Sequence, residues 1–438
     1  MQGAAKRSFR PPEPSGVRTT DGEDSLDDLL AMASNGIHRS GVATPGALPP
    51  AIVLGGCQNA LSVARNLARQ GIEVIALNYP YEAIRFSRYA RYVKLAGDGS
   101  PRAWERFLLS ADSEHFSGSV LLPCSDEAVS IVVNNYEALS RKFQLEETDP
   151  ETRRELLDKF MTYRLAQNAG IPTVCYSLVR TQDQLERATS ILRFPMIMKP
   201  LYSPDRLLLK FKTALIADPD ELIRRFSAAA EVGVGVVLME YIPGGDDRLC
   251  SYYTYLDERG NPLVHFTKRV KRRYPLESGD GTYHVTDWIP EAADLGLRFF
   301  RHLNFRGLGN IEFKWDERDR TLKVIEVNAR FTASDCLLTK SGVNLALITY
   351  NRITHRPQPP VFGFRKSLVL CRPIEDALAA WSLRKAGRLR LSEWLAELGR
   401  VDLLPFFEWR DPMPAVAVLS RRIWRLGDTL FSSNSSAA

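Results

Sequence analysis

The chain has 438 residues, of which 45% are hydrophobic and 25% are charged. This balance indicates a globular protein of two or three domains with a large buried core. The net charge of +6 is modest and its basic residues are scattered, which argues against nucleic acid as a partner. No stretch has the roughly 20 apolar residues that a membrane span needs, and the N-terminus lacks a signal-peptide pattern.

The six cysteines stand far apart, with no spacing typical of a zinc or redox motif. We therefore expect reduced thiols and a cytoplasmic location. Residues 1–48 mix Pro, Gly, Ser and charged residues, so we expect this segment to be disordered. The alternative is that its short apolar patch at Leu26, Leu29 and Leu30 forms a helical turn or a docking peptide.

Residues 49–148 show the pattern of a parallel, doubly wound α/β domain. A buried strand begins at Ala51, helical spacing follows over residues 60–70, and a second apolar strand comes next. Another buried strand and helix follow within residues 119–139. The pair Gly55-Gly56 after the first strand is not part of a GxGxxG motif, so a dinucleotide site is not predicted.

Residues 149–360 contain strands in which charged residues interrupt apolar runs. A helix is predicted over residues 150–169, ended by Gly170 and Pro172. A hairpin is predicted from residues 309–316 and 322–330, joined by a charged turn. Between the helix and the hairpin, strands are predicted at residues 194–200, 206–217, 234–242 and 249–256.

The hairpin places carboxylates inside apolar strands, at Glu312 and Glu326. Burying an unpartnered carboxylate is costly, so these groups need a cation, hydrogen bonds or an open cleft. Strand alternation puts Glu326, Asn328 and Arg330 on one face. Such oxygen ligands suit Mg²⁺ bound together with nucleotide phosphates. The alternative is a surface hairpin with a simple Glu/Arg pair.

From about residue 50 to 355 the order of motifs resembles the ATP-grasp superfamily. The motifs are Asp158-Lys159, Met198-Lys199-Pro200, the hinge from Met239 to Gly244, and Glu312 with Glu326-x-Asn328-x-Arg330. The resemblance implies an α/β and α+β architecture: an N-terminal doubly wound preATP-grasp domain, then an ATP-grasp domain whose two subdomains sandwich ATP.

The resemblance also assigns roles to single residues. Lys159 and Lys199 would contact nucleotide phosphates, although each lysine taken alone is better explained as a solvated surface charge. Hinge residues Met239, Glu240, Tyr241 and Ile242 would lie along the adenine edge, with Asp246 or Asp247 on the ribose. Glu312, Glu326 and Asn328 would hold Mg²⁺, with Mn²⁺ as another candidate ion.

Two further expectations concern the transferred phosphoryl group. Arg330 would steady the acyl phosphate, and Lys268 or Arg269 would meet the phosphate or acyl group, unless this basic cluster is only a solvated strand end. The family's glycine-rich loop is replaced here by a glycine-free segment, residues 202–206. Arg206 or Lys210 could compensate with side-chain charge.

The implied function is an ATP-dependent carboxylate-amine or carboxylate-thiol ligase that forms an acyl phosphate and releases ADP and phosphate. The alternatives are a kinase or carboxylase on the same scaffold, or a nucleotide-binding regulator with weakened catalysis. The N-terminal domain resembles that of the carbamoyl-phosphate synthase and D-aspartate ligase groups. In it, Ser125-Asp126-Glu127 would help to shape a pocket for the small-molecule acid and amine, or would simply cap a helix.

Residues 361–438 read as an accessory region with apolar and aromatic helices. The basic amphipathic segment near the C-terminus is expected to pack on the core or to form a homodimer contact, rather than to bind a membrane.

Overall fold

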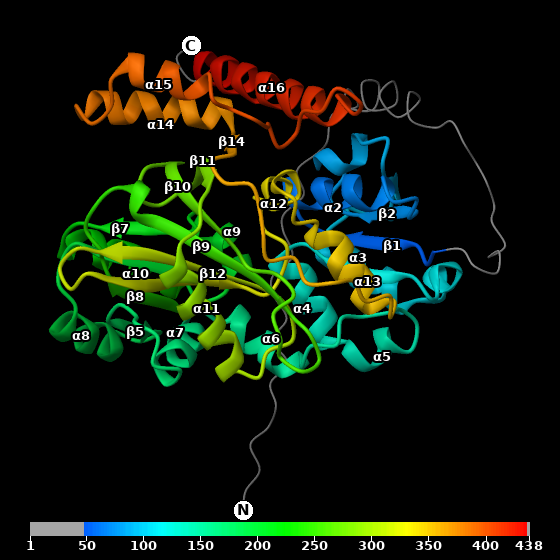
Figure 1. Cartoon of the computed structure of the whole chain (residues 1–438). Coiled ribbons are helices and arrows are strands. Elements are labelled where there is room, and N and C mark those ends of the chain that lie inside the picture. The colour runs from blue at the N-terminus through cyan, green and yellow to red at the C-terminus, as the bar shows by residue number, and fades with distance from the viewer. Residues whose placement is uncertain (1–47, 436–438) are drawn as a thin grey trace, which may run out of the picture. The chain divides into compact units, whose positions relative to one another are not determined.

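The structure is a computed structural model that describes residues 48–435, with side chains described up to residue 424. The predictions for residues 1–47 lie outside this range. Residues 48–435 belong to one compact unit, in which three sheets are packed together (Figure 1).

The first sheet is parallel, with the order β3-β2-β1-β4. Ala51 and Val53 pack toward α2, whereas Ile52 and Leu54 pack toward α3 and α4, so both faces of the sheet are covered. This confirms the predicted doubly wound arrangement. The elements are β1 (Ala51–Leu54), α2 (Gln58–Ala68), β2 (Val74–Leu77), β3 (Arg91–Tyr92), α3 (Pro101–Leu109), β4 (Val120–Pro123), α4 (Asp126–Asn134) and α5 (Tyr136–Ser140).

The second sheet is small and antiparallel, with the order β5-β8-β6-β7. Met196 and Met198 of β6 pack with helices α8 and α10, so alternation turns Ile197 and Lys199 to the other face. The elements are β5 (Tyr176–Val179), α8 (Gln182–Ile191), β6 (Met196–Pro200), β7 (Ala214–Ile216), α10 (Pro219–Glu231) and β8 (Val236–Glu240).

The third sheet has six antiparallel strands in the order β13-β12-β9-β10-β11-β14. Helix α11 covers one face, where it packs on Ile311 and Phe313, and the alternating positions Glu312 and Lys314 face the other way. The elements are β9 (Leu249–Leu256), β10 (Phe266–Tyr274), β11 (Asp280–Thr286), α11 (Pro290–His302), β12 (Gly307–Asp316), β13 (Thr321–Asn328) and β14 (Val369–Cys371).

Two local predictions are wrong. The helix expected over residues 150–169 is two helices, α6 (Pro150–Leu157) and α7 (Lys159–Asn168), because Asp158 is extended and its carboxylate accepts the Met161 N–H at 3.0 Å as an N-cap. The strand expected over residues 206–217 is limited to β7, since the preceding leucines form the short helix α9 (Arg206–Leu209).

The C-terminal region adds a layer of helices, shown in orange and red in Figure 1. Arg272 of β10 is buried and pairs with Asp376 of α14 at 2.8 Å, and it also pairs with Glu397 of α15. Arg65 of α2 pairs with Asp411 at 2.9 Å, so the region contacts the third sheet and also helix α2, which covers one face of the first sheet. Its helices are α14 (Pro373–Lys385), α15 (Leu391–Leu398) and α16 (Met413–Ser435). The preceding helices α12 (Asp335–Ser341) and α13 (Leu345–Ile353), drawn in yellow and gold, pack against α2 instead.

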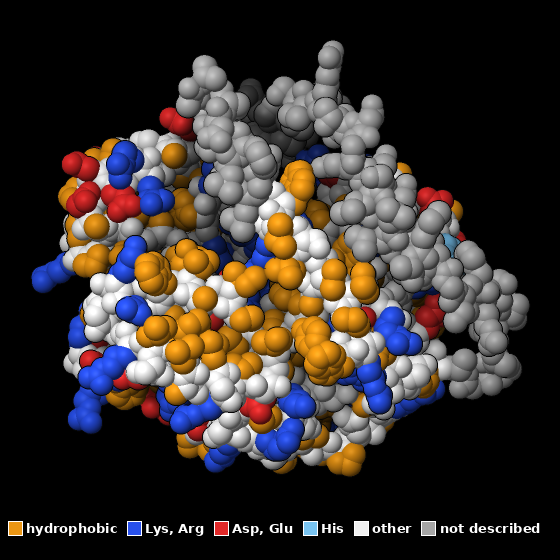
Figure 2. All heavy atoms as spheres, turned by 90° about the horizontal axis from the view of Figure 1, so that it is seen from above, with side chains coloured by type: hydrophobic (Ala, Val, Ile, Leu, Met, Phe, Trp, Pro, Cys, Tyr) orange, Lys and Arg blue, Asp and Glu red, His pale blue; other side chains and the backbone are white. Residues whose placement is uncertain are grey.

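The surface of this side of the molecule carries mixed charge. Figure 2 shows Lys and Arg side chains scattered among hydrophobic and acidic ones rather than gathered into one patch. Within the described range, no helix has the length and apolar character needed to cross a membrane. The boundaries expected at residues 148 and 360 stay a prediction.

Candidate active site

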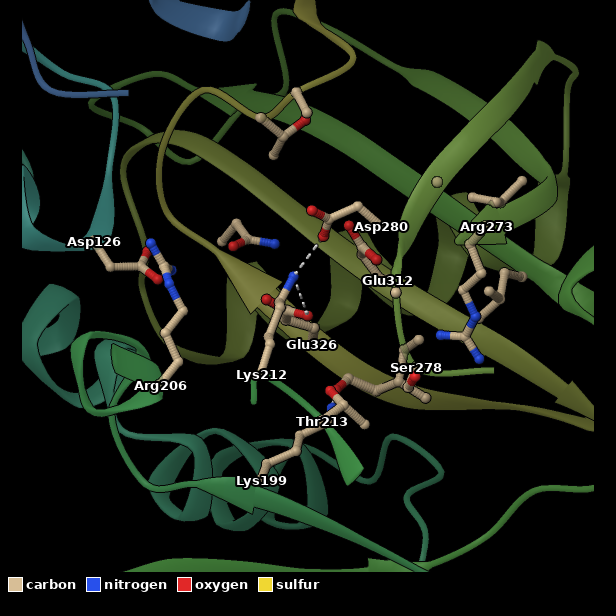
Figure 3. A pocket seen from close by; sticks show the side chains of 18 of the residues that line it. Asp126, Lys199, Arg206, Lys212, Thr213, Arg273, Ser278, Asp280, Glu312 and Glu326 are labelled. Carbon is tan, nitrogen blue, oxygen red and sulfur yellow. Dashed lines mark hydrogen bonds and ion pairs between the residues drawn. The ribbon is translucent and has the colours of Figure 1, made fainter. Parts of the chain in front are cut away.

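A cavity of about 590 Å³ lies where the three sheets meet, and Figure 3 shows part of its wall. The small sheet contributes Lys199 and the end of β8, and the six-stranded sheet contributes Glu312 and Glu326. The loops that follow β1 and β4 of the parallel sheet close the third side, at the carboxyl ends of parallel strands where ligands commonly bind. Segments far apart in the sequence therefore share one pocket.

Two carboxylates stand side by side in this wall. Glu312 of β12 and Glu326 of β13 are direct partners in the antiparallel register. Burial and the neighbouring Glu326 raise the pKa of Glu312. For Glu326, burial is outweighed by Lys212, Lys199 and Lys159, which together lower its pKa. The pair is therefore a concentration of negative charge that a cation would stabilise.

Asn328 supplies a third oxygen next to the carboxylates. Its amide nitrogen donates to Asn310 Oδ1 at 3.2 Å, and the Asn310 amide donates to the Tyr252 carbonyl at 3.1 Å. This chain of hydrogen bonds fixes the Asn328 amide and leaves its oxygen free to accept from, or bind, a ligand in the cavity.

The two predicted phosphate lysines lie at different depths. Lys199 is buried and donates to the Ile325 carbonyl at 2.9 Å, and burial lowers its pKa to about 8. Lys159, at the start of α7, donates to Ser203 Oγ at 3.2 Å. It lines a small adjoining cavity together with Glu326 and Asn328, and does not line the large one.

The hinge after β8 forms another part of the wall, through Met239, Glu240, Tyr241 and Ile242. Lys314, which the sequence reasoning missed, holds this hinge: its ammonium donates to the carbonyls of Ile242 at 2.8 Å and Gly244 at 3.1 Å. A signal for it was present, because Lys314 is two residues from Glu312 and so lies on the same strand face.

The two aspartates predicted for a ribose contact lie outside the lining of the large cavity. Asp246 is buried and pairs with Arg273 at 2.6 Å, whereas Asp247 is exposed. Glu277 is the carboxylate in the wall near the hinge, and it accepts from the Tyr241 hydroxyl at 3.0 Å. The ribose contact of Asp246 or Asp247 stays a prediction.

The basic cluster in β10 divides between two faces, because Lys268 and Arg269 are consecutive. Lys268 is buried in the cavity wall, 3.2 Å from Ser251 Oγ and 3.3 Å from His284 Nδ1. Burial and Lys268 lower the pKa of His284, so this imidazole is neutral. Arg269 is half exposed, pairs with Asp287 at 2.7 Å and is absent from the wall, which makes Lys268 the candidate of the two.

Arg330 connects the hairpin to the parallel sheet. Its Nε lies 2.5 Å from Asp126 Oδ1, and this carboxylate follows β4. Asp126 raises the pKa of Arg330 against the effect of burial, so the guanidinium is charged. Ser125 caps α4 by accepting the Ala128 N–H at 3.2 Å, as one of the two sequence interpretations expected.

The glycine-free loop before β7 extends into the cavity through charged side chains. Arg206 lines the cavity and lies 3.6 Å from Glu127, whereas Lys210 is exposed and lies outside the lining. Lys212, which the sequence reasoning did not single out, lies 3.2 Å from Asp280 and 3.9 Å from Glu326 (Figure 3). The loop therefore places one lysine directly among the carboxylates.

The donor set fits magnesium. Mg²⁺ takes one or two protein carboxylates and completes its shell from water and phosphate. Glu312, Glu326 and the Asn328 oxygen offer such a partial shell. Among the described residues, no group of three or more His, Cys, Asp or Glu side chains could hold a metal by itself. An ion at this site would therefore depend on phosphate or water ligands as well.

Comparisons with known proteins find similar sequences among ATP-binding domains and ligases. The family described as carbamoyl-phosphate synthase L chain, ATP binding domain, matches residues 291–354. D-aspartate ligase of Enterococcus faecium is 23% identical over 326 residues, which cover 70% of this chain and 77% of that protein.

Solved structures show the same fold. An ADP complex of N5-carboxyaminoimidazole ribonucleotide synthetase matches with a TM-score of 0.57 at 13% identity, covering 74% of this chain and 81% of that one. The biotin carboxylase domain of 2-oxoglutarate carboxylase from Hydrogenobacter thermophilus, solved with MgADP and bicarbonate, has a TM-score of 0.57 at 16% identity and covers 73% of each chain.

Proposed function

We propose that this chain, which has the ATP-grasp fold of the carboxylate–amine ligases, uses Mg-ATP to join a carboxylic acid to an amine. The observation that carries the proposal is the pairing of Glu312 with Glu326 on adjacent strands, facing Lys199 from the opposite sheet across one cavity. Carboxylates for a cation and lysines for phosphates thus lie within one site. A carboxylate–thiol ligase would use the same first step.

The nucleotide would lie between the small sheet and the six-stranded sheet. Lys199 and Lys159 supply positive charge for phosphates, and the hinge after β8 presents backbone groups to a base. Glu312, Glu326 and Asn328 would hold Mg²⁺, or Mn²⁺ in its place. The bound ion would neutralise phosphate charge and so favour transfer of the phosphoryl group.

The first chemical step is transfer of the terminal phosphoryl group of ATP. An oxygen of the acid's carboxylate attacks the γ-phosphorus, the bond from that phosphorus to the bridging oxygen breaks, and ADP leaves. Such a transfer depends on charge neutralisation and positioning more than on a protein nucleophile. Arg330 and Lys268, both N–H donors in the wall, would bind the transferring phosphoryl group or the acyl oxygen.

The second step forms the new bond. A neutral amine attacks the acyl carbon, and the acyl C–O bond breaks as phosphate leaves with the electron pair. The nitrogen passes one proton to the departing phosphate or to solvent. Phosphate is a far better leaving group than oxide, which is why the acid must first be phosphorylated. The loops after β1 and β4 form the wall beyond Arg330 and are our candidates for the acid and amine pockets.

The test is ADP release measured with Mg²⁺ over a panel of paired amino acids and amines, with Glu326→Gln beside the wild type. This variant should lose most turnover while keeping its far-UV circular dichroism spectrum. Glu317→Gln is the matched control, because Glu317 belongs to the same hairpin but is 61% exposed and pairs with Arg248.

Several outcomes would contradict the proposal. Full turnover by Glu326→Gln would contradict the metal assignment. Accumulation of a phosphorylated acid without ligation would favour the kinase interpretation, and nucleotide binding without ADP release on every substrate pair would favour a regulator. The cytoplasmic location and a homodimer stay predictions.

A further inference from the structure

Lys212 occupies the position in the cavity where a cation would be needed. Its ammonium lies 3.2 Å from Asp280 on β11 and 3.9 Å from Glu326 on β13. In Figure 3 the side chain rises from the loop below and points between these two carboxylates, beside Glu312. Its ion-pair partners are thus acidic groups of the opposite sheet, one of which is the central candidate metal ligand.

The loop that carries Lys212 is anchored to the small sheet by packing and reaches the other walls of the cavity by charge. Leu209 and Phe211 pack against the core of the small sheet, whereas Leu207 and Leu208 are 70% and 57% exposed. Arg206 reaches Glu127 on α4, the helix that follows β4 of the parallel sheet, and Lys212 reaches the six-stranded sheet. The loop is therefore joined to α4 and to the six-stranded sheet by partly exposed ion pairs. A bound ligand can displace ion pairs of this kind.

The other lysines of the site are anchored differently. Lys199 is buried on a strand and donates to a backbone carbonyl, and Lys159 donates to a serine hydroxyl. Lys212 keeps 45% of its side-chain surface exposed and pairs with carboxylates alone. Of these three lysines, it is the one whose carboxylate partners would instead bind an added cation.

We propose that Lys212 is a substitute cation in the nucleotide-free protein and a phosphate ligand in the nucleotide complex. It neutralises Glu326 and its neighbours until Mg-nucleotide binds, and then shifts its ammonium to the phosphates and holds the glycine-free loop over them. Side-chain charge would thereby do what backbone N–H groups do in a glycine-rich loop. This inference rests on the proposed function.

The electrostatics give the proposal two consequences of opposite sign. An ammonium 3.9 Å from Glu326 repels any cation that approaches the same carboxylate, so Lys212 should weaken metal binding in the absence of nucleotide. Nucleotide phosphates bring negative charge, so the same ammonium should strengthen nucleotide binding. A lysine that served only as a structural bridge would not shift the two affinities in opposite directions.

The experiment measures Mn²⁺ binding without nucleotide by electron paramagnetic resonance, and binding of Mg²⁺ with a non-hydrolysable ATP analogue by calorimetry. Lys212→Met should bind Mn²⁺ about tenfold more tightly and the nucleotide about tenfold more weakly than wild type. Lys212→Arg should retain most of the wild-type behaviour. Lys210→Met is the matched control, since Lys210 is exposed on the same loop but outside the cavity lining.

Unchanged affinities in Lys212→Met, or a weakening of both, would overturn the proposal and leave Lys212 as a structural ion pair. That result would leave the proposed function intact, provided that Glu326→Gln still abolishes Mn²⁺ binding. A wild-type protein that binds neither Mn²⁺ nor the nucleotide would overturn the proposed function, and this inference with it.

Discussion

The ammonium of Lys199 and the hydroxyl of Tyr163 both donate to one backbone carbonyl, that of Ile325, at 2.9 and 2.7 Å. The lysine comes from β6, the tyrosine from α7 and the carbonyl from β13. This one carbonyl therefore hydrogen-bonds both β6 of the small sheet and helix α7 to β13, the strand that carries Glu326. Because Ile325 precedes Glu326, this contact also fixes the strand position next to the candidate metal ligand.

This relationship predicts a pH dependence of nucleotide binding. Burial lowers the pKa of Lys199 to about 8, and a phosphate requires the charged form. Nucleotide affinity should therefore be full below that pKa and fall as pH rises from 7 to 9, with proton uptake on binding near pH 8. Calorimetry in buffers of different ionisation enthalpy measures both quantities.

Lys199→Arg is the control for this prediction, because a guanidinium stays charged over the whole range. Burial likewise lowers the pKa of Lys314 to about 8, so Lys314 titrates in the same range. The difference between the pH profiles of wild type and Lys199→Arg therefore gives the contribution of Lys199 to the pH dependence of nucleotide affinity. A pH profile for wild type as flat as that of Lys199→Arg would contradict the prediction.

A second prediction concerns Lys314 and the hinge. Lys314→Met removes a charged donor from the carbonyls of Ile242 and Gly244, which then lose their hydrogen-bond partner. The hinge should lose its fixed position, so the KM for ATP should rise about tenfold while kcat at saturating ATP changes far less. Initial-rate kinetics check this, with the exposed Lys340→Met as control. A fall in kcat at unchanged KM would count against a hinge role.

A third prediction concerns Asp335, at the start of α12. Its side chain is 2% exposed, one oxygen accepts from Ser62 at 2.7 Å and the other has no partner. Burial raises the pKa of Asp335 to about 7. The folded state therefore keeps a proton on Asp335 that the unfolded state releases near pH 4. The contribution of Asp335 should make the free energy of unfolding decrease as the pH rises from about 4 to 7.

Asp335→Asn removes this titration while keeping the shape of the side chain. The variant should be more stable than wild type at pH 8, by on the order of 2 kcal/mol, and the difference should shrink toward pH 5. Urea unfolding at several pH values measures it, with Ser62→Ala showing the contribution of the hydrogen bond. A pH-independent difference would show that the carboxyl does not titrate in this range.

A fourth prediction concerns the contact between the C-terminal region and the six-stranded sheet. Asp376 is fully buried and accepts from Arg272 at 2.8 and 3.0 Å, from Thr282 at 2.9 Å and from Trp394 at 2.9 Å. Asp376→Ala leaves the Arg272 charge buried with fewer partners, which should cost about 3–5 kcal/mol.

The comparison for this variant is an exposed ion pair on α11, Arg298 with Asp294 at 3.1 Å, where Asp294→Ala should cost about 0.5 kcal/mol or less. Urea unfolding of both variants gives the two values. Adding Arg272→Met to Asp376→Ala should recover part of the loss, because it removes the unpaired charge. Equal effects of the two single variants would show that the Arg272 cluster does not secure the C-terminal region.

Much of the fold could be predicted from local pattern. Strands β1, β9, β12 and β13 were predicted within one or two residues, because buried strands and period-two alternation are properties of short segments. The same alternation placed Glu326 and Asn328 on one face, and both line the cavity. The break at Asp158 is not predicted, because the sequence around this N-cap has the pattern of a continuing helix. The short helix at Leu207 is not predicted either, because an exposed run of leucines has the pattern of a strand.

The sequence by itself determined several strands, the hairpin and the presence of carboxylates and lysines with a family's spacing, because each of these depends on residues close together in the chain. Only the tertiary structure decided which charges meet. Lys212 reaches Asp280 and Glu326, Lys314 reaches the hinge, and Arg269 points away from the cavity on the strand whose Lys268 faces it. Coulombic interaction and hydrogen bonding act over a few ångströms of space, and the distance along the chain does not encode which side chains will come that close.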